Sequence, residues 1–209
     1  MRGADLVGLT VLALLSVKDS HPYELQRLIV ATHKDYVTGL PRSLYHAVER
    51  LDGSQLIEPA ETVRDGRRPE RTVYRITDEG RGHLAGRLRN LIEVPDPDRR
   101  GFVAAVSLLG CLPAATARKS LRTRAAVITG TVTGLAEQVA ALRGEEMPDV
   151  VLLELEYELA VQRAELDWIG TVLDRIERGE LDWSGTARLD LLDDVLREPA
   201  ETELRKKTP

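Results

Sequence analysis

Cysteine is nearly absent from this chain, and that absence sets the first limits. The one cysteine, Cys111, has no second cysteine with which to form an internal disulfide, and it lies in an apolar run beside Gly110 and Leu112. Apolar surroundings raise the pKa of a thiol and favour an inert core residue. Because proteins of oxidising compartments commonly carry paired cysteines, we expect a reducing, cytoplasmic setting.

Long apolar runs are also missing. No unbroken apolar run approaches the roughly 18 residues that span a bilayer, so we expect no membrane association. The short apolar stretch near the N-terminus is preceded by Asp5 and has no small-residue cleavage site after it. We therefore expect the first helix of a domain there rather than a signal peptide. With 43% apolar and 30% charged residues, the composition is that of an ordinary soluble globular protein.

The signatures of common enzymes do not occur. The chain has no glycine-rich phosphate loop, no Gly-x-Ser-x-Gly elbow, no His-Glu-x-x-His and no Cys-x-x-Cys pair. His33 and His83 lack companions at metal-ligand spacing, so we expect no metal and no cofactor. We expect a protein that is not an enzyme, since an active site would have to be assembled from residues without a sequence signature.

The chain also lacks an excess of positive charge: it has 29 Lys+Arg against 34 Asp+Glu, so the formal net charge is −5. This balance argues against a protein that coats DNA through bulk attraction. The charge is uneven along the chain: residues 1–92 hold 14 Lys+Arg against 12 Asp+Glu, and residues 93–209 hold 15 against 22. Since phosphate would repel the acidic second half, we expect that half to face away from any nucleic acid.

The prolines divide the chain. Pro95 and Pro97 stand one residue apart and cannot continue a helix, so a joint is expected there. We predict a first domain at 1–92, a linker at 93–100, a helical domain at 101–183, and a C-terminal helix and tail at 184–209. Within the tail, residues 187–197 have the pattern of a further amphipathic helix.

The segment 41–80 is the most informative part of the sequence. A helix from Pro41 has an apolar arc formed by Leu44, Ala47, Val48 and Leu51. Strands are predicted at 56–63 and 72–76 around an Asp-Gly turn at 65–66, and Thr77 can cap the next helix. Two helices precede the segment, capped by Asp5 and by Ser20 or His21. This order is typical of a winged helix-turn-helix, whose third helix enters the major groove and whose hairpin contacts flanking backbone.

The candidate DNA-binding residues are polar side chains on the third helix and the hairpin. Donors suited to guanine edges or phosphates lie on the outer face of the helix, and arginines cluster at the hairpin tip. Tyrosine hydroxyls can also reach phosphates, but a partly buried packing role is the favoured interpretation for Tyr23, Tyr45 and Tyr74. The candidates are Tyr23, Arg42, Ser43, Tyr45, His46, Arg50, Arg64, Arg67, Arg68 and Arg71, with Arg75 on the returning strand. A solvated hairpin and an ordinary polar helix face are the alternatives.

The second half shows heptad spacing twice. Apolar residues recur at intervals of 4 and 3 from 121 to 142 and, with one polar member, from 155 to 176. Two such helices can form a self-contained antiparallel pair, but two helices cover little of each other, so a homodimer is the favoured interpretation. The predicted dimerisation residues are Leu121, Ile128, Leu135, Leu155, Leu159, Leu166, Ile169 and Leu173. Trp168 lies just off this seam and either covers an effector cavity or packs against a neighbouring helix.

The expected fold class is mainly α: a winged helix-turn-helix domain with a two-stranded wing, followed by a dimerisation domain of long, coiled-coil-like helices. Three patches make the chain resemble the PadR family of bacterial transcriptional regulators. They are residues 21–25 (HPYEL), residues 43–45 (SLY) with Leu51 and 56–58 (LIE), and residues 74–80 (YRITDEG). The resemblance covers residues 6–92, and the second half is similar to the larger subgroup of the family in architecture.

The resemblance implies a repressor that dimerises through C-terminal helices and binds a pseudo-palindromic DNA operator. It also implies release by a phenolic or other small planar effector. The sequence departs from the usual family text at Pro22, Arg42, His46 and Gln55, and Glu70 interrupts the basic run of the wing. Because Arg42 and His46 lie on the outward helix face, we expect an operator preference particular to this chain. The alternative function is a winged helix that acts as a protein-interaction module and recruits a partner through its C-terminal helices.

Overall fold

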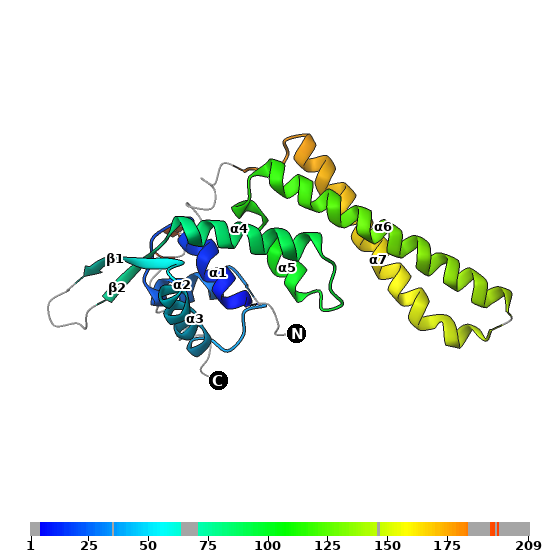
Figure 1. Cartoon of the computed structure of the whole chain (residues 1–209), viewed down its shortest axis with the longest axis horizontal. Helices are drawn as coiled ribbons and strands as arrows, with labels where there is room; N and C mark the ends of the chain where they lie inside the picture. Colours follow the sequence, from blue (N-terminus) through cyan, green and yellow to red (C-terminus); the bar gives the residue numbers. More distant parts are fainter. Residues whose placement is uncertain are drawn as a thin grey trace.

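The computed structural model describes residues 5–34, 36–63, 71–145, 147–183, 193, 194 and 196. It is mainly helical, with one two-stranded antiparallel sheet. The elements are α1 (Leu6–Leu15), α2 (Pro22–Ala31), α3 (Arg42–Gly53), β1 (Ile57–Val63), β2 (Arg71–Ile76), α4 (Asp78–Glu93), α5 (Arg100–Ser107), the 3-10 helix η1 (Leu109–Cys111), α6 (Ala114–Gly144) and α7 (Asp149–Glu177). Figure 1 shows a compact group of short helices beside the sheet, and a long α6–α7 hairpin that extends away from it.

The helix starts follow local capping chemistry. The Asp5 carboxylate accepts from the Gly8 amide at 3.0 Å and begins α1. Of the two predicted caps for α2, His21 is the one used, and it forms a capping box with Glu24 while Pro22 occupies the first turn. The Thr77 hydroxyl caps α4. Caps of this kind each contribute about 1 kcal/mol, so they fix where the helices begin.

The core of the N-terminal part is built around α1. This helix is buried from Gly8 to Leu15, and it contacts α2, α3, α4 and β2. A helix that is apolar all round needs cover on every side, which the surrounding elements supply. The apolar arc of α3 faces it as predicted, with Leu44, Ala47, Val48 and Leu51 all buried.

The two strands form the base of the wing. Ile57 pairs with Ile76 and Val63 pairs with Arg71, with an irregularity between Pro59 and Glu61. Tyr74 of β2 also bridges to Ser20, which ties the loop before α2 to the sheet. The predicted turn at 65–66 lies outside the described residues, as does most of the predicted C-terminal helix at 187–197.

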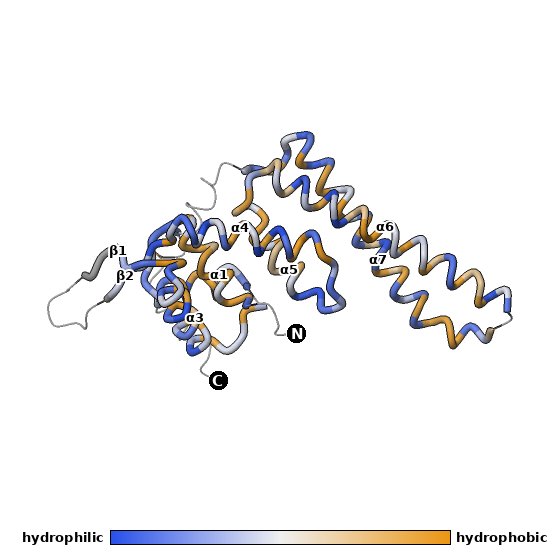
Figure 2. Tube along the Cα trace, viewed as in Figure 1, coloured by the Kyte–Doolittle hydropathy of each residue, from blue (hydrophilic) through white to orange (hydrophobic). Residues whose placement is uncertain are grey.

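The second half is an antiparallel helical hairpin. α6 and α7 pack along each other, and α4 packs against α6. Figure 2 shows apolar stretches recurring along both long helices out to the far end of the hairpin. Near the other end, the Trp183 indole donates to the Leu112 carbonyl at 2.7 Å and holds the chain that follows α7 against η1.

α6 corrects one expectation about apolar length. By length and composition it is the one helix among the described residues that could cross a membrane, with an 18-residue window of mean hydropathy 1.3 of which 11% is buried. A count of unbroken apolar runs missed it because small residues such as Gly130, Thr131 and Gly134 interrupt the valines and leucines. The helix therefore presents a long, weakly polar surface that α7 covers in part.

Candidate nucleic-acid interface

The outer face of α3 is the clearest candidate surface. Arg42, Tyr45, His46 and Glu49 are all exposed, and their spacing of 3 and 4 residues places them on one side of the helix. Tyr45 has 44% of its surface exposed. The buried arc of α3 packs on the core directly opposite, so the helix presents this row rigidly.

Contacts along the row are loose. The Arg42 Nε donates to His46 Nε2 at 3.5 Å, and His46 Nδ1 lies 3.5 Å from a Glu49 carboxylate oxygen. Exposed contacts of this length contribute little to stability. These side chains can therefore exchange their present partners for a base edge or a phosphate at small cost.

Two of the predicted donors on α3 are held by protein groups. Ser43 donates its hydroxyl hydrogen to the Thr38 carbonyl at 2.8 Å. Arg50 forms an ion pair with Asp5, the residue that also caps α1. This pair fastens the C-terminal half of α3 to the start of α1, so Arg50 has a structural partner in the protein without DNA.

Tyr23 lies on the first turn of α2, and 46% of its surface is exposed. For Tyr23 and Tyr45 the sequence favours a partly buried packing role, but the side chains of both are exposed. Tyr74, by contrast, packs against the core. Burial, together with the nearby Asp52 and Glu49 carboxylates, raises the pKa of Tyr74 above its usual value. Tyr74 therefore supports the wing base, whereas the two exposed tyrosines have free surface to offer.

The predicted wing arginines fall mainly in the part of the hairpin that is not described. Arg64, Arg67 and Arg68 lie outside the described residues, and Arg71 is placed by its backbone in β2. Arg75 is paired across the sheet with Glu58 at 2.7 Å. Its charge is thus partly neutralised by a carboxylate of the protein.

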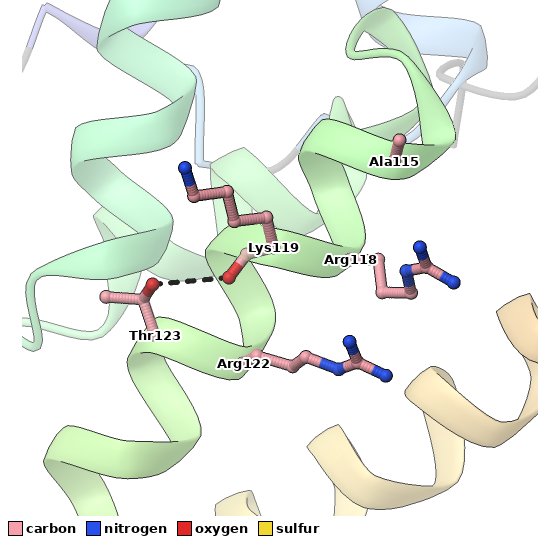
Figure 3. A pocket seen from close by; sticks show the side chains of 5 residues that line it. All are labelled: Ala115, Arg118, Lys119, Arg122 and Thr123. Carbon is pink, nitrogen blue, oxygen red and sulfur yellow. Dashed lines mark hydrogen bonds between the residues drawn. The ribbon is translucent and has the colours of Figure 1, made fainter.

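A second basic surface, which the sequence reasoning missed, lies on the first turns of α6. Ala115, Arg118, Lys119, Arg122 and Thr123 line a shallow depression of about 500 Å³, shown in Figure 3. Arg122 reaches Glu177 of α7 at 2.5 Å. α1 and α4 lie between α3 and α6 in the packing order, so this surface is separate from the α3 face.

Residues 11–86 match the family model described as the transcriptional regulator PadR-like family. This N-terminal segment is thus similar to the PadR-like family. The matched segment begins within α1 and ends within α4, so it includes α3 and the complete wing hairpin. The match therefore lies in the part of the chain that carries the α3 face.

Three solved structures, two of them described as PadR or PadR-like, are similar to the chain over most of its length. Bacillus subtilis PadR in complex with operator DNA is 17% identical and has a TM-score of 0.39, covering 81% of this chain and 98% of that one. A Streptococcus mutans protein is 22% identical with a TM-score of 0.37, covering 83% and 99%. A PadR-like regulator from Bacillus cereus is 18% identical with a TM-score of 0.36, covering 83% and 99%. The comparison with curated proteins finds no match.

Proposed function

We propose that this protein is a PadR-like transcriptional regulator: a cytoplasmic, sequence-specific DNA-binding repressor that acts as a homodimer on a pseudo-palindromic operator. The observation that carries the proposal is the α3 face, a rigidly held row of exposed polar side chains beside an antiparallel wing. A helix held in this way fits the major groove, and bidentate arginine contacts to a base edge discriminate by about 1–3 kcal/mol each. Occupancy of the operator would then block transcription.

The test is a mobility-shift titration with duplex DNA from upstream of the protein's own gene. Arg42→Ala removes a cation of the α3 face and is expected to weaken binding by about 5- to 150-fold. Arg163→Ala removes an exposed arginine of α7 and should leave binding unchanged. Absence of any shift with the wild-type protein at low salt would refute DNA binding and favour the protein-interaction module.

The homodimer is supported by an outward apolar stripe on α7. Val150, Leu153 and Tyr157 are 72%, 57% and 66% exposed and follow each other at spacings of 3 and 4 residues. Ala160, Ala164 and Trp168 continue the row, and all three are exposed. A contiguous apolar stripe of this kind usually marks an interaction site, and a second copy of the helix offers a matching surface.

The eight predicted heptad residues differ in how far they are buried within the single chain. Four of them are buried within one chain: Leu121, Ile128, Leu159 and Ile169. Leu135, Leu155, Leu166 and Leu173 are half-buried. These eight remain predicted dimerisation residues, and the outward stripe from Val150 to Ala164 adds a surface that is exposed in the described part of the chain.

Sedimentation of the double variant Leu153→Glu/Tyr157→Glu tests the dimer. Two charges on the stripe should give a monomer that keeps its helical circular dichroism, since both residues are exposed in the single chain. Arg163→Glu, a charge change at an exposed polar position of the same helix, should remain dimeric. A wild-type protein that sediments as a monomer at micromolar concentration would contradict the proposal.

Effector release is supported by a cleft of about 750 Å³ between α1, the loop before α3, and the α4–α5 junction. Leu91 and Phe102 form part of its apolar wall, and Arg87 and Asn90 supply polar groups. Tyr36 also lines it, and its buried hydroxyl makes no hydrogen bond of normal geometry with the described residues. Asp5, Asp96 and Asp98 line the cleft too, and Asp5 and Asp98 are paired with Arg50 and Arg100. Arg87 is therefore the cation at which a small planar molecule with an acidic group would bind.

Trp168, the predicted effector residue, does not line this cleft, but its ring lies edge-on to Phe102, which does. Titration with benzoate, followed through tryptophan fluorescence, tests the site. Arg87→Gln should weaken the response at least fivefold. Arg89→Gln, a neighbouring arginine paired with Glu93 outside the cleft, should not. A response unaffected by Arg87→Gln would place the effector elsewhere.

A further inference from the structure

One buried arginine lies where the winged-helix part meets the hairpin. Arg124 of α6 is 1% exposed. Its Nε donates to a Glu165 carboxylate oxygen of α7 at 2.5 Å, and its Nη1 donates to the Ile92 carbonyl of α4 at 3.1 Å. The guanidinium carbon also lies 3.7 Å from the centre of the Phe102 ring of α5. One planar cation therefore contacts three neighbouring helices in addition to its own.

Further contacts around Arg124 join the same helices. The Ser120 hydroxyl, one turn earlier on α6, donates to Glu93 at the end of α4 at 2.6 Å. Arg99, just before α5, lies 3.8 Å from Glu165. Phe102 also contacts Trp168, with ring centres 6.0 Å apart and planes at 90°. The last turn of α4 is thus held to α6 by two hydrogen bonds, and Arg124 and Arg99 both reach the same carboxylate of α7.

A buried charge is retained at a desolvation cost, and a hydrophobic side chain of similar size often serves stability equally well. A guanidinium, unlike a hydrophobic side chain, also fixes the directions in which its hydrogen-bond acceptors must lie, because its N–H donors form a rigid planar fork. Here that fork meets a helix-end carbonyl and a carboxylate on different helices. Only one mutual orientation of α4, α6 and α7 satisfies both contacts and the ring at once.

The orientation of α4 matters because α4 reaches the DNA-facing end of the molecule. It has 16 residues, which makes it about 24 Å long. At its start, the Thr77 amide donates to the Leu56 carbonyl beside the first strand of the wing. A tilt of about 10° at the Arg124 end moves the other end by roughly 4 Å, which is close to the 3.4 Å rise of one base pair.

We propose that Arg124 is the positioning residue that fixes the winged-helix part relative to the α6–α7 hairpin, and so sets the half-site spacing that the dimer reads. The proposal rests on the proposed DNA-binding function for its operator readout. The orientation itself is a property of the single chain and can be measured without DNA. Neither the α3 face nor the outward stripe of α7 includes Arg124.

The first experiment measures that orientation by pulsed electron paramagnetic resonance on the full chain. Spin labels at Gly82→Cys on α4 and Glu137→Cys on α6, both exposed positions, report the distance between the two helices in a Cys111→Ser background. Arg124→Met should broaden the distance distribution at least twofold, and Arg124→Lys, which keeps the charge without the planar fork, should broaden it less. Arg122→Lys, at the exposed arginine two residues earlier on α6, should match the wild type. Equal widths in all four proteins would overturn the proposal.

The second experiment uses operators that the wild-type protein selects from a random duplex library, rebuilt with the half-sites 1 or 2 base pairs closer or further apart. The wild type should prefer one spacing by at least tenfold, and Arg124→Met should reduce this preference at least fivefold. Equal weakening on every spacing would mean that Arg124 acts on stability alone, and would refute the proposal. Failure of the wild type to bind any duplex would refute the proposed function, while the label distances would still decide the role of Arg124.

Discussion

Gly80 offers the sharpest test of how α4 is seated against the wing. A Cβ built on Gly80 would lie 2.0 Å from the Leu56 carbonyl oxygen and 2.8 Å from the Ile76 Cγ1. The carbonyl belongs to the backbone and already accepts from the Thr77 amide at 3.2 Å, so it cannot move aside freely. Gly80→Ala should therefore displace the start of α4 and weaken the cap that Thr77 provides.

The expected cost follows from the nature of the clash. Inserting a methyl group into a packed site typically costs about 1–3 kcal/mol, and a backbone obstacle places Gly80→Ala at the upper end, about 3 kcal/mol. Gly82→Ala is the matched control, since a Cβ there meets nothing within 4 Å and the residue is exposed on the same helix. Replacing a helical glycine by alanine in open space gains about 0.8–1.0 kcal/mol.

Thermal unfolding followed by circular dichroism at 222 nm measures both effects. For a chain of this size each kcal/mol shifts the melting temperature by about 2–4 °C. Gly80→Ala should therefore melt about 6–12 °C below the wild type, and Gly82→Ala about 2–4 °C above it. Melting temperatures within about 2 °C of each other for the two variants would show that the seating of α4 against Leu56 is wrong.

Three further results are expected. Arg67→Ala/Arg68→Ala removes four arginines from the dimer and should lower the slope of log affinity against log salt by up to about 3.6 in mobility-shift titrations, if all four neutralise phosphates, and an unchanged slope would remove them from the interface. Burial raises the pKa of Tyr36 above its usual 10.0. The unfolded chain therefore loses this proton first, and stability falls as the pH rises from about 10 through the folded pKa. Tyr36→Phe should lessen that fall in urea unfolding, and an identical fall would refute the assignment. Arg124→Ala leaves the Glu165 carboxylate without its 2.5 Å partner, and should lower the free energy of unfolding by about 3–5 kcal/mol by urea titration, whereas a loss under 1 kcal/mol would contradict the buried pair.

Features decided by near neighbours in sequence were predictable. The cap of α1 by Asp5 and the cap of α4 by Thr77 follow from side chains that bond backbone amides three residues later. The buried arc of α3 follows from helical periodicity in the same way. Since these signals depend on a few consecutive residues, the sequence alone locates the helices and the face that α3 leaves exposed.

Features decided by distant residues were not predictable. Arg50 and Asp5 are 45 positions apart, and nothing in either local pattern indicates that they pair. The pairing of Arg75 with Glu58 depends on the sheet register, which includes an irregularity between Pro59 and Glu61. In both cases an arginine that looks available for DNA from its position has a protein carboxylate as a partner. A candidate interface drawn from charge alone therefore overstates the free positive charge on α3 and β2.

The long helices show how far a periodic pattern can be taken. Heptad spacing records that one face of a helix is covered, and Leu121 and Ile128 are indeed buried, but the spacing does not say which surface covers them. Here the cover within one chain comes from the neighbouring helices, so the same leucines that predict a dimer also satisfy a hairpin. A dimer then needs a second face, and the exposed row from Val150 to Tyr157 is such a face at heptad-like spacing.

Arg124 lies between the first two heptad positions, where the pattern predicts an ordinary exposed polar residue. It is buried because α4 and α5 meet α6 at this point. The pattern therefore predicts the hairpin, whereas the contacts that direct the hairpin toward the winged helix come from residues that the pattern counts as solvent-facing.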